Sequence, residues 1–138
     1  RWDGARNDRK YPWGERLPIP AKAGNFADAQ AVYLQGQILQ DYDDGFRVAA
    51  PVASFAANPL GLHDLGGNVL EWATDLYTIY PDGGAVAVDP TGPAAGQAYV
   101  IRGSSWLTGR VAELRLAWRD SGSSGRQNLG FRLARYAE

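Results

Sequence analysis

Hydrophobic and polar residues alternate in the last third of the chain, and this alternation predicts short β-strands. Residues 99–102 read Tyr-Val-Ile-Arg and are followed by Gly103, a pattern typical of a strand that stops at a turn. Residues 114–119 and 130–136 alternate apolar with basic side chains, so that each segment would bury one face. We therefore expect three strands, with residues 130–136 as the terminal strand.

The first two thirds of the chain show weaker periodicity and many turn-forming residues. The 17 glycines and 8 prolines are spread evenly, which predicts loops around short elements. Residues 25–39 have some helical spacing but weak caps and are predicted to mix loop with short helix. Residues 68–77 fit either a helix or a strand that enters a loop. The expected fold class is α+β, loop-rich around a small antiparallel sheet.

Length and composition indicate one folded domain over residues 1–138. Apolar residues make up 45% of the chain and charged residues 21%, which is ordinary for a globular domain. The net charge of -1 provides no field that would attract nucleic acid or an anionic membrane. No apolar stretch approaches the length needed to cross a membrane. We expect no nucleic-acid partner and no membrane span.

Two residue types are absent from the sequence. Without methionine the chain has no translation start, so we expect a processed form or a piece of a longer protein. Without cysteine it has no thiolate nucleophile, disulfide, thiolate zinc site or copper-thiolate site. The absence of cysteine fits the cytoplasm and the cell exterior alike. We expect a bacterial protein in a secreted or periplasmic location.

The most informative stretch is residues 58–72, in which Asp64 and Glu71 lie on either side of a Gly-Gly turn. Glycine allows a tight turn that exposes carbonyl groups, so a hard cation could lie between the two carboxylates and backbone oxygens. The stretch resembles the signature of the formylglycine-generating enzyme (sulfatase-modifying factor) family. The family's other motifs follow in its order at residues 11–14, 25–28, 43–46, 50–52, 89–93, 102–106, 114–119 and 128–132.

The resemblance implies a C-type-lectin-like fold. Family members begin well upstream of the Tyr-Pro-Trp-Gly motif at residues 11–14, so the chain would be the C-terminal portion of such a domain. The terminal strand at residues 130–136 would then lose a neighbour, because the missing part contributes to the sheet. We expect a second protein chain, or a segment near Arg1, to complete the sheet there.

The resemblance also implies a structural calcium site at Asp64, Gly67, Val69 and Glu71. The two acidic side chains and the carbonyls of Gly67 and Val69 would be its ligands. The alternative is a metal-free turn in which Glu71 caps backbone amides and Asp64 is solvated. His63 receives no role.

A second calcium site is implied at residues 25–46, with side-chain oxygens from Asn25 and Asp44 and carbonyls from Phe26 and Phe46. The alternative is an ordinary acidic turn. An EF-hand is excluded here, because the glycine is in the fifth place of the loop and valine stands in the twelfth.

Residues 104–114 correspond to the segment in which the family's enzymes carry a redox-active cysteine pair. Thr108 falls near the first cysteine position, and the second falls at Ala112 or Glu113. Threonine cannot bind copper(I) or form a mixed disulfide. The resemblance therefore implies no copper and no formylglycine generation by this chain.

The expected function is a non-catalytic binding or scaffold domain that presents loops 107–113 and 120–127 to an unknown ligand. The predicted ligand surface consists of Trp106, Thr108, Arg110, Glu113 and Arg119. The motif arginines would form either a carboxylate-binding surface or, as we favour, a structural network with acidic and aromatic side chains.

Two other functions stay open. The chain could be the substrate-binding part of a non-heme iron enzyme similar to the sulfoxide synthases. With His63 as its one histidine, it would bind no iron itself. It could also be an assembly subunit that exchanges a strand with a partner.

Overall fold

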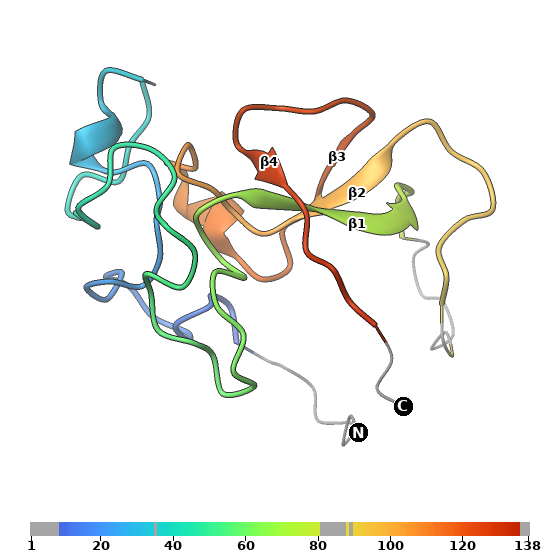
Figure 1. Cartoon of the computed structure of the whole chain (residues 1–138), viewed down its shortest axis with the longest axis horizontal. Coiled ribbons are helices and arrows are strands. Elements are labelled where there is room, and N and C mark those ends of the chain that lie inside the picture. Colours follow the sequence, from blue (N-terminus) through green and yellow to red (C-terminus); the bar gives the residue numbers. More distant parts are fainter. Residues whose placement is uncertain (1–8, 35, 81–87, 89, 136–138) are drawn as a thin grey trace.

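Four short strands form one mixed sheet at the centre of the molecule. The structure is a computed structural model that describes residues 9–34, 36–80, 88 and 90–135. The strands are β1 (Leu70–Leu76), β2 (Tyr99–Arg102), β3 (Asp120–Gly122) and β4 (Leu129–Gly130), in the order β3-β2-β1-β4 (Figure 1). β1, β2 and β3 pair antiparallel, whereas β4 runs parallel to β1. The sheet is therefore mixed and not purely antiparallel as predicted, because the chain returns from β3 across the sheet to the far side of β1.

The stretch that fitted either a helix or a strand is the strand β1. It pairs with β2 through Trp72 opposite Ile101 and Leu76 opposite Tyr99, with an irregularity between these pairs. Its own residues have mixed propensity, so pairing with the buried strand β2 decides its conformation. The predicted strand at residues 99–102 is confirmed as β2.

The predicted strand at residues 114–119 is wrong. This segment contains the end of the 3-10 helix η2 (Val111–Leu114) and a turn, and β3 begins at Asp120. Arg102 donates hydrogen bonds to the carbonyls of Leu116 and Trp118, both at 2.7 Å. At these two positions the carbonyls bind a side chain in place of a neighbouring strand.

The predicted terminal strand at residues 130–136 is also wrong in its extent. Of the described residues in this segment, Leu129 and Gly130 alone pair with β1, residues 131–135 continue without regular structure, and Tyr136 lies outside the described residues. Phe131 and Leu133 are 74% and 87% exposed, so the alternation of this segment buries no face in the chain itself. Its predicted cover by a partner stays a prediction, and residues 1–8 lie outside the described residues.

The loop-rich N-terminal half lies beside the sheet (Figure 1). An apolar core holds it together. Its buried members are Tyr11, Phe26, Leu39, Tyr42 and Leu114. The rings of Phe26 and Tyr42 lie 5.6 Å apart between centroids, a separation at which aromatic pairs attract. Leu114 belongs to the C-terminal third, so this core ties the two halves together.

The predicted mixture of loop and short helix at residues 25–39 is confirmed. Its helical part is the 3-10 helix η1 (Ala29–Ala31), and the N–H of Gln30 donates to Asp28 Oδ1 at 2.8 Å as an N-cap. The loop-rich α+β class is confirmed with it. Within the described residues, no helix has the length and apolar character needed to cross a membrane.

Candidate cation sites and loop surface

Asn25 and Asp44 lie at the centre of the more deeply buried of the two predicted cation sites. Asn25 is fully buried and Asp44 is 8% exposed. The N–H groups of Phe26 and Phe46 donate to the two carboxylate oxygens of Asp44 at 2.8 and 2.9 Å. The Asn25 side-chain amide donates to the Val48 carbonyl at 2.8 Å. Its oxygen, Oδ1, is buried and has no hydrogen-bond partner in the described part of the chain.

A second buried carboxylate, Asp28, adds negative charge beside Asp44. Asp28 is fully buried, and its Oδ2 accepts a hydrogen bond from the Asp44 N–H at 2.7 Å. Burial raises the pKa of Asp44 to about 6, with a further increase from the charge of Asp28, while the N–H donors of Phe26 and Phe46 lower it. Asp28 was absent from the predicted ligands, although it closes the Asn-Phe-Ala-Asp motif.

These residues fit a hard cation. An unpartnered buried amide oxygen is unfavourable, and a cation that accepts oxygen ligands would satisfy it. A carboxylate retains lone pairs after it accepts two N–H donors, so Asp44 can also coordinate a metal. The carbonyls of Phe26 and Phe46 stay predicted ligands, and the N–H groups of the same residues contact Asp44.

Asp64 and Glu71, the carboxylates of the other predicted site, line one cavity of about 220 Å³ with His63, Val69 and Arg132. Arg132 binds Glu71 in a bidentate ion pair, with Nη2 at 2.6 Å from Oε1 and Nε at 3.1 Å from both oxygens. Arg132 also donates to the His63 carbonyl at 2.9 Å. The pair with Glu71 raises the pKa of Arg132.

In this arrangement the guanidinium of Arg132 already occupies the carboxylate that calcium would need. Asp64 is also engaged, because its Oδ2 accepts from the Ala53 N–H at 2.8 Å. The metal-free alternative therefore needs correction as well, since Glu71 binds a guanidinium and Asp64 caps an amide. His63 contacts the Phe55 carbonyl through Nδ1 at 2.7 Å, which is a structural role. In the described residues, no cluster of three histidine, aspartate or glutamate side chains could hold a metal.

Gly67 joins the two candidate cation sites. Its φ is +134°, and a Cβ there would lie 2.9 Å from the Asn25 nitrogen. The N–H of Asn68 donates to the Asn25 carbonyl at 2.9 Å. Only glycine allows these two backbones to approach so closely.

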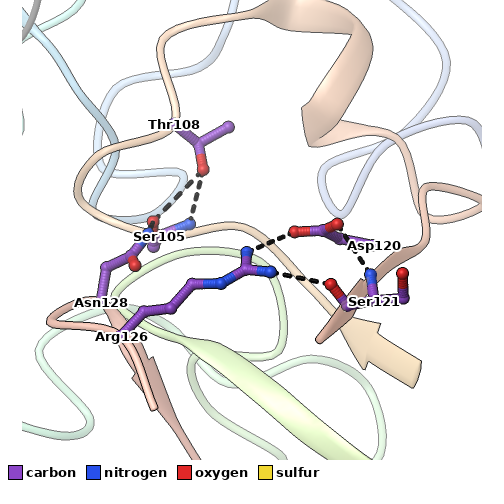
Figure 2. Close-up of polar contacts among 6 residues, drawn as sticks. All are labelled: Ser105, Thr108, Asp120, Ser121, Arg126 and Asn128. Carbon is purple, nitrogen blue, oxygen red and sulfur yellow. Dashed lines mark hydrogen bonds and ion pairs between the residues drawn. The ribbon is translucent and has the colours of Figure 1, made fainter. Parts of the chain in front are cut away.

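Thr108, at the expected first cysteine position, is buried and bound within its own turn. The N–H of Ser105 donates to Thr108 Oγ1 at 3.0 Å, and the two hydroxyl oxygens lie 3.3 Å apart (Figure 2). The Asn128 amide donates to Ser105 Oγ at 2.8 Å. These contacts join the loop after β2 to the segment that enters β4.

The predicted ligand surface needs correction at two positions. Trp106 and Thr108 are 8% and 6% exposed, because their turn packs into the molecule, so neither belongs to the surface. Arg110 is exposed, while Glu113 and Arg119 are half-buried. Arg110 donates to Gln37 Oε1 at 2.6 Å and lies 3.6 Å from Glu113, so the 107–113 loop is fastened to the N-terminal half.

Contacts of the motif arginines agree with the structural interpretation. The Arg119 guanidinium carbon lies 4.0 Å from the Tyr80 ring centroid and 5.0 Å from that of Tyr77. Arg102 bonds backbone carbonyls and Arg132 bonds Glu71, as described above. Arg119 Nε is buried and has no hydrogen-bond partner among the described residues.

The 120–127 loop is closed at its base by Arg126. Its guanidinium pairs with Asp120 at 2.5 Å and donates to the Ser121 carbonyl at 2.8 Å (Figure 2). The Ser121 N–H donates back to Asp120 at 2.7 Å. The turn that follows β3 is therefore held against this strand.

The chain belongs to the family described as the sulfatase-modifying factor enzyme 1-like domain, which it matches over residues 2–137. It is 35% identical to the formylglycine-generating enzyme of Streptomyces coelicolor over 98% of this chain and 43% of the relative. It is 32% identical to the formylglycine-generating enzyme of Bos taurus over 95% of this chain and 35% of the relative. A mouse relative named inactive C-alpha-formylglycine-generating enzyme 2 is 30% identical over 95% of this chain and 38% of the relative.

Solved structures share the fold. PvdO from Pseudomonas aeruginosa superposes with a TM-score of 0.63 at 24% identity, over 85% of this chain and 40% of PvdO. Treponema denticola variable protein 1 gives a TM-score of 0.58 at 26% identity, over 83% of this chain and 45% of that protein. The expected family and its loop-rich, C-type-lectin-like fold class are confirmed. The chain spans less than half the length of these relatives.

Proposed function

We propose that this chain is a non-catalytic binding domain stabilised by calcium. The observation that carries the proposal is Thr108, which stands where the family's enzymes need a thiol and whose hydroxyl contacts Ser105 in its own turn. Oxidation of a cysteine side chain through copper(I) and a mixed disulfide requires sulfur ligands that can exchange. A buried threonine has no sulfur atom, so it can neither bind copper(I) as a thiolate nor form a mixed disulfide.

Calcium would contribute stability at Asn25 and Asp44. When bound, it would supply positive charge to two buried carboxylates and a cation for Asn25 Oδ1 to coordinate. The chain's own residues hold these oxygens in place, because Phe26 and Phe46 orient Asp44 and Val48 orients the Asn25 amide. At Asp64 and Glu71 calcium would have to displace Arg132, so we place the stronger site at Asn25 and Asp44.

The ligand would be held by loops 107–113 and 120–127. The 107–113 loop is fastened to the N-terminal half through Arg110 and Gln37, and the 120–127 loop is closed at its base through Arg126 and Asp120. Loops held on a rigid base are common sites of recognition because they lose little conformational entropy on binding. The mouse relative is named inactive, which supports a role without catalysis.

Two assays test this proposal. The first incubates the chain with copper and a cysteine-containing sulfatase-type peptide, and mass spectrometry should detect no aldehyde. A formylglycine-generating enzyme serves as the positive control, and aldehyde formation above the no-enzyme rate would refute the non-catalytic assignment.

The second assay screens the chain against immobilised peptides, glycans and small molecules, using wild type and an Arg110→Ala, Arg126→Ala double variant. We expect at least one ligand class to bind wild type and to be lost in the variant. Retention of all binding by a folded variant would show that these loops are not the binding surface.

A further inference from the structure

A cleft beside the 120–127 loop combines two aromatic rings with free hydroxyl groups. It has a volume of about 370 Å³ and is lined by Trp72, Ala73, Tyr99 and residues 123–125. The ring centroids of Trp72 and Tyr99 lie 6.2 Å apart at 84°, an edge-to-face arrangement. Its volume lies within the range of small-molecule sites and suits a single ring-sized ligand. Neither Trp72 nor Tyr99 was predicted to belong to a site.

Strand register places the two rings. Tyr99 and Ile101 are two residues apart in β2 and share one face of the sheet, and Trp72 lies opposite Ile101. Ile101 is fully buried and lies on that face as the cross-strand neighbour of Trp72. A Cβ on Gly122 would lie 3.4 Å from Trp72 Cη2 and 3.1 Å from Arg126 Nη2. Because Gly122 has no side chain, the Trp72 indole and the Arg126 guanidinium can both pack against its backbone.

The clamp made by Arg126 holds the polar side of the cleft in position. Its bonds to Asp120 and Ser121 close the turn that carries Ser123 and Ser124 (Figure 2). Neither serine hydroxyl, nor that of Tyr99, makes a hydrogen bond with another described residue. Three hydroxyl groups around one cleft are thus available as donors and acceptors.

The charges near the cleft are paired with each other. Asp120 and Arg126 neutralise one another, and no charged side chain lines the cleft among the described residues. A ligand suited to it is uncharged, has a flat face of C–H groups for the negative face of an aromatic ring, and has hydroxyls at its rim. A pyranose ring has all three properties. We propose that this cleft binds a neutral pyranose, an assignment that rests on the proposed binding function.

The test is saturation-transfer difference NMR on the full chain with the methyl glycosides of glucose, galactose and mannose. At least one glycoside should bind at millimolar concentration, with the strongest transfer to ring C–H protons. Tyr99→Ala should weaken binding roughly five- to tenfold, since it removes an aromatic contact. The Ser123→Ala, Ser124→Ala double variant should also weaken it. Tyr33→Ala is the matched control, because Tyr33 is 89% exposed and lies outside the cleft.

Three results would overturn the assignment. These are no transfer to any glycoside, unchanged binding in the folded Tyr99→Ala and double-serine variants, or cleft binding by a proline-rich peptide in place of a sugar. If the glycosides fail while another ligand is lost on Arg110→Ala, the pyranose assignment fails and the binding function stands. If no ligand of any class binds, the proposed function fails with it.

Discussion

At the scale of the residue, the unusual features of this chain are buried polar groups. Asn25, Asp28 and Asp44 are removed from water in one small region, and Asn25 Oδ1 has no partner among the described residues. A buried charge is costly unless it is paired or binds a metal. This cost gives the second cation site a physical basis that its sequence motif alone did not provide.

We expect calcium to raise the unfolding temperature, and Asp44→Asn to remove most of this effect. Binding to the native state alone adds about 2.7 kcal/mol at a calcium concentration one hundred times the dissociation constant. Thermal unfolding with calcium and with a chelator measures it. Asp43→Asn is the control, because Asp43 is exposed and accepts a hydrogen bond from the Gly45 N–H of its own turn. An unfolding temperature that is the same with calcium and with the chelator would count against the site.

The Glu71–Arg132 pair should be worth about 1 kcal/mol to the free energy of unfolding. Its bidentate geometry favours a measurable contribution, but the Arg132 side chain is 36% exposed and that of Glu71 is 19% exposed, so solvent reduces it. We expect Glu71→Gln to lower stability by that amount in urea unfolding, and by less at high salt. The comparison variant is Arg135→Gln on the same exposed tail. It should change the free energy of unfolding by about 0.5 kcal/mol at most. Equal effects of the two substitutions would contradict the assignment.

At the scale of the element, close backbone contact holds the loops together. Gly67 lies against Asn25, while η2 contributes Leu114 to the core of the N-terminal half. The strands are short and supply few ladder hydrogen bonds. Contacts between loops therefore stabilise much of the fold.

Gly67→Ala should therefore destabilise the chain more than Gly14→Ala. The two glycines have φ of +134° and +133°, so the backbone penalty is matched. A Cβ at Gly67 would lie 2.9 Å from the Asn25 nitrogen, whereas one at Gly14 would meet nothing within 4 Å. We expect an excess of about 1–3 kcal/mol at Gly67 from this overlap, measured by denaturant unfolding. If the two substitutions lower the free energy of unfolding equally, the close contact between Gly67 and Asn25 does not contribute to stability.

At the scale of the whole molecule, the C-terminal tail exposes apolar side chains beside an edge strand. Phe131 is 74% exposed, Leu133 is 87% exposed, and β4 is the last strand of the sheet on that side. An apolar edge of this kind favours pairing with another chain or segment.

We expect the chain to associate through this edge, and Leu133→Lys to weaken association more than Arg135→Lys. Because Leu133 is exposed in the chain itself, its replacement should leave the unfolding of the monomer nearly unchanged. Analytical ultracentrifugation over a range of concentrations measures the association. A monomer at all concentrations, or equal effects of the two variants, would refute the expectation.

The sequence by itself determined the family, the loop-rich class and the strand at residues 99–102. It did so because turn residues, apolar alternation and ordered motifs are local properties of the chain. It also located both acidic loops, since glycine turns and carboxylates can be recognised without knowledge of their neighbours.

Only the tertiary structure decided what those residues contact. The alternation of residues 114–119 indicated a strand, but Arg102, from strand β2, donates hydrogen bonds to two carbonyls of this segment. Glu71 appeared free for a metal until folding brought Arg132, 61 residues away, against it. Trp72, Tyr99 and the 123–125 turn form a cleft only because strand register aligns them. Contacts between distant segments depend on the three-dimensional path of the backbone, and no local pattern encodes that path.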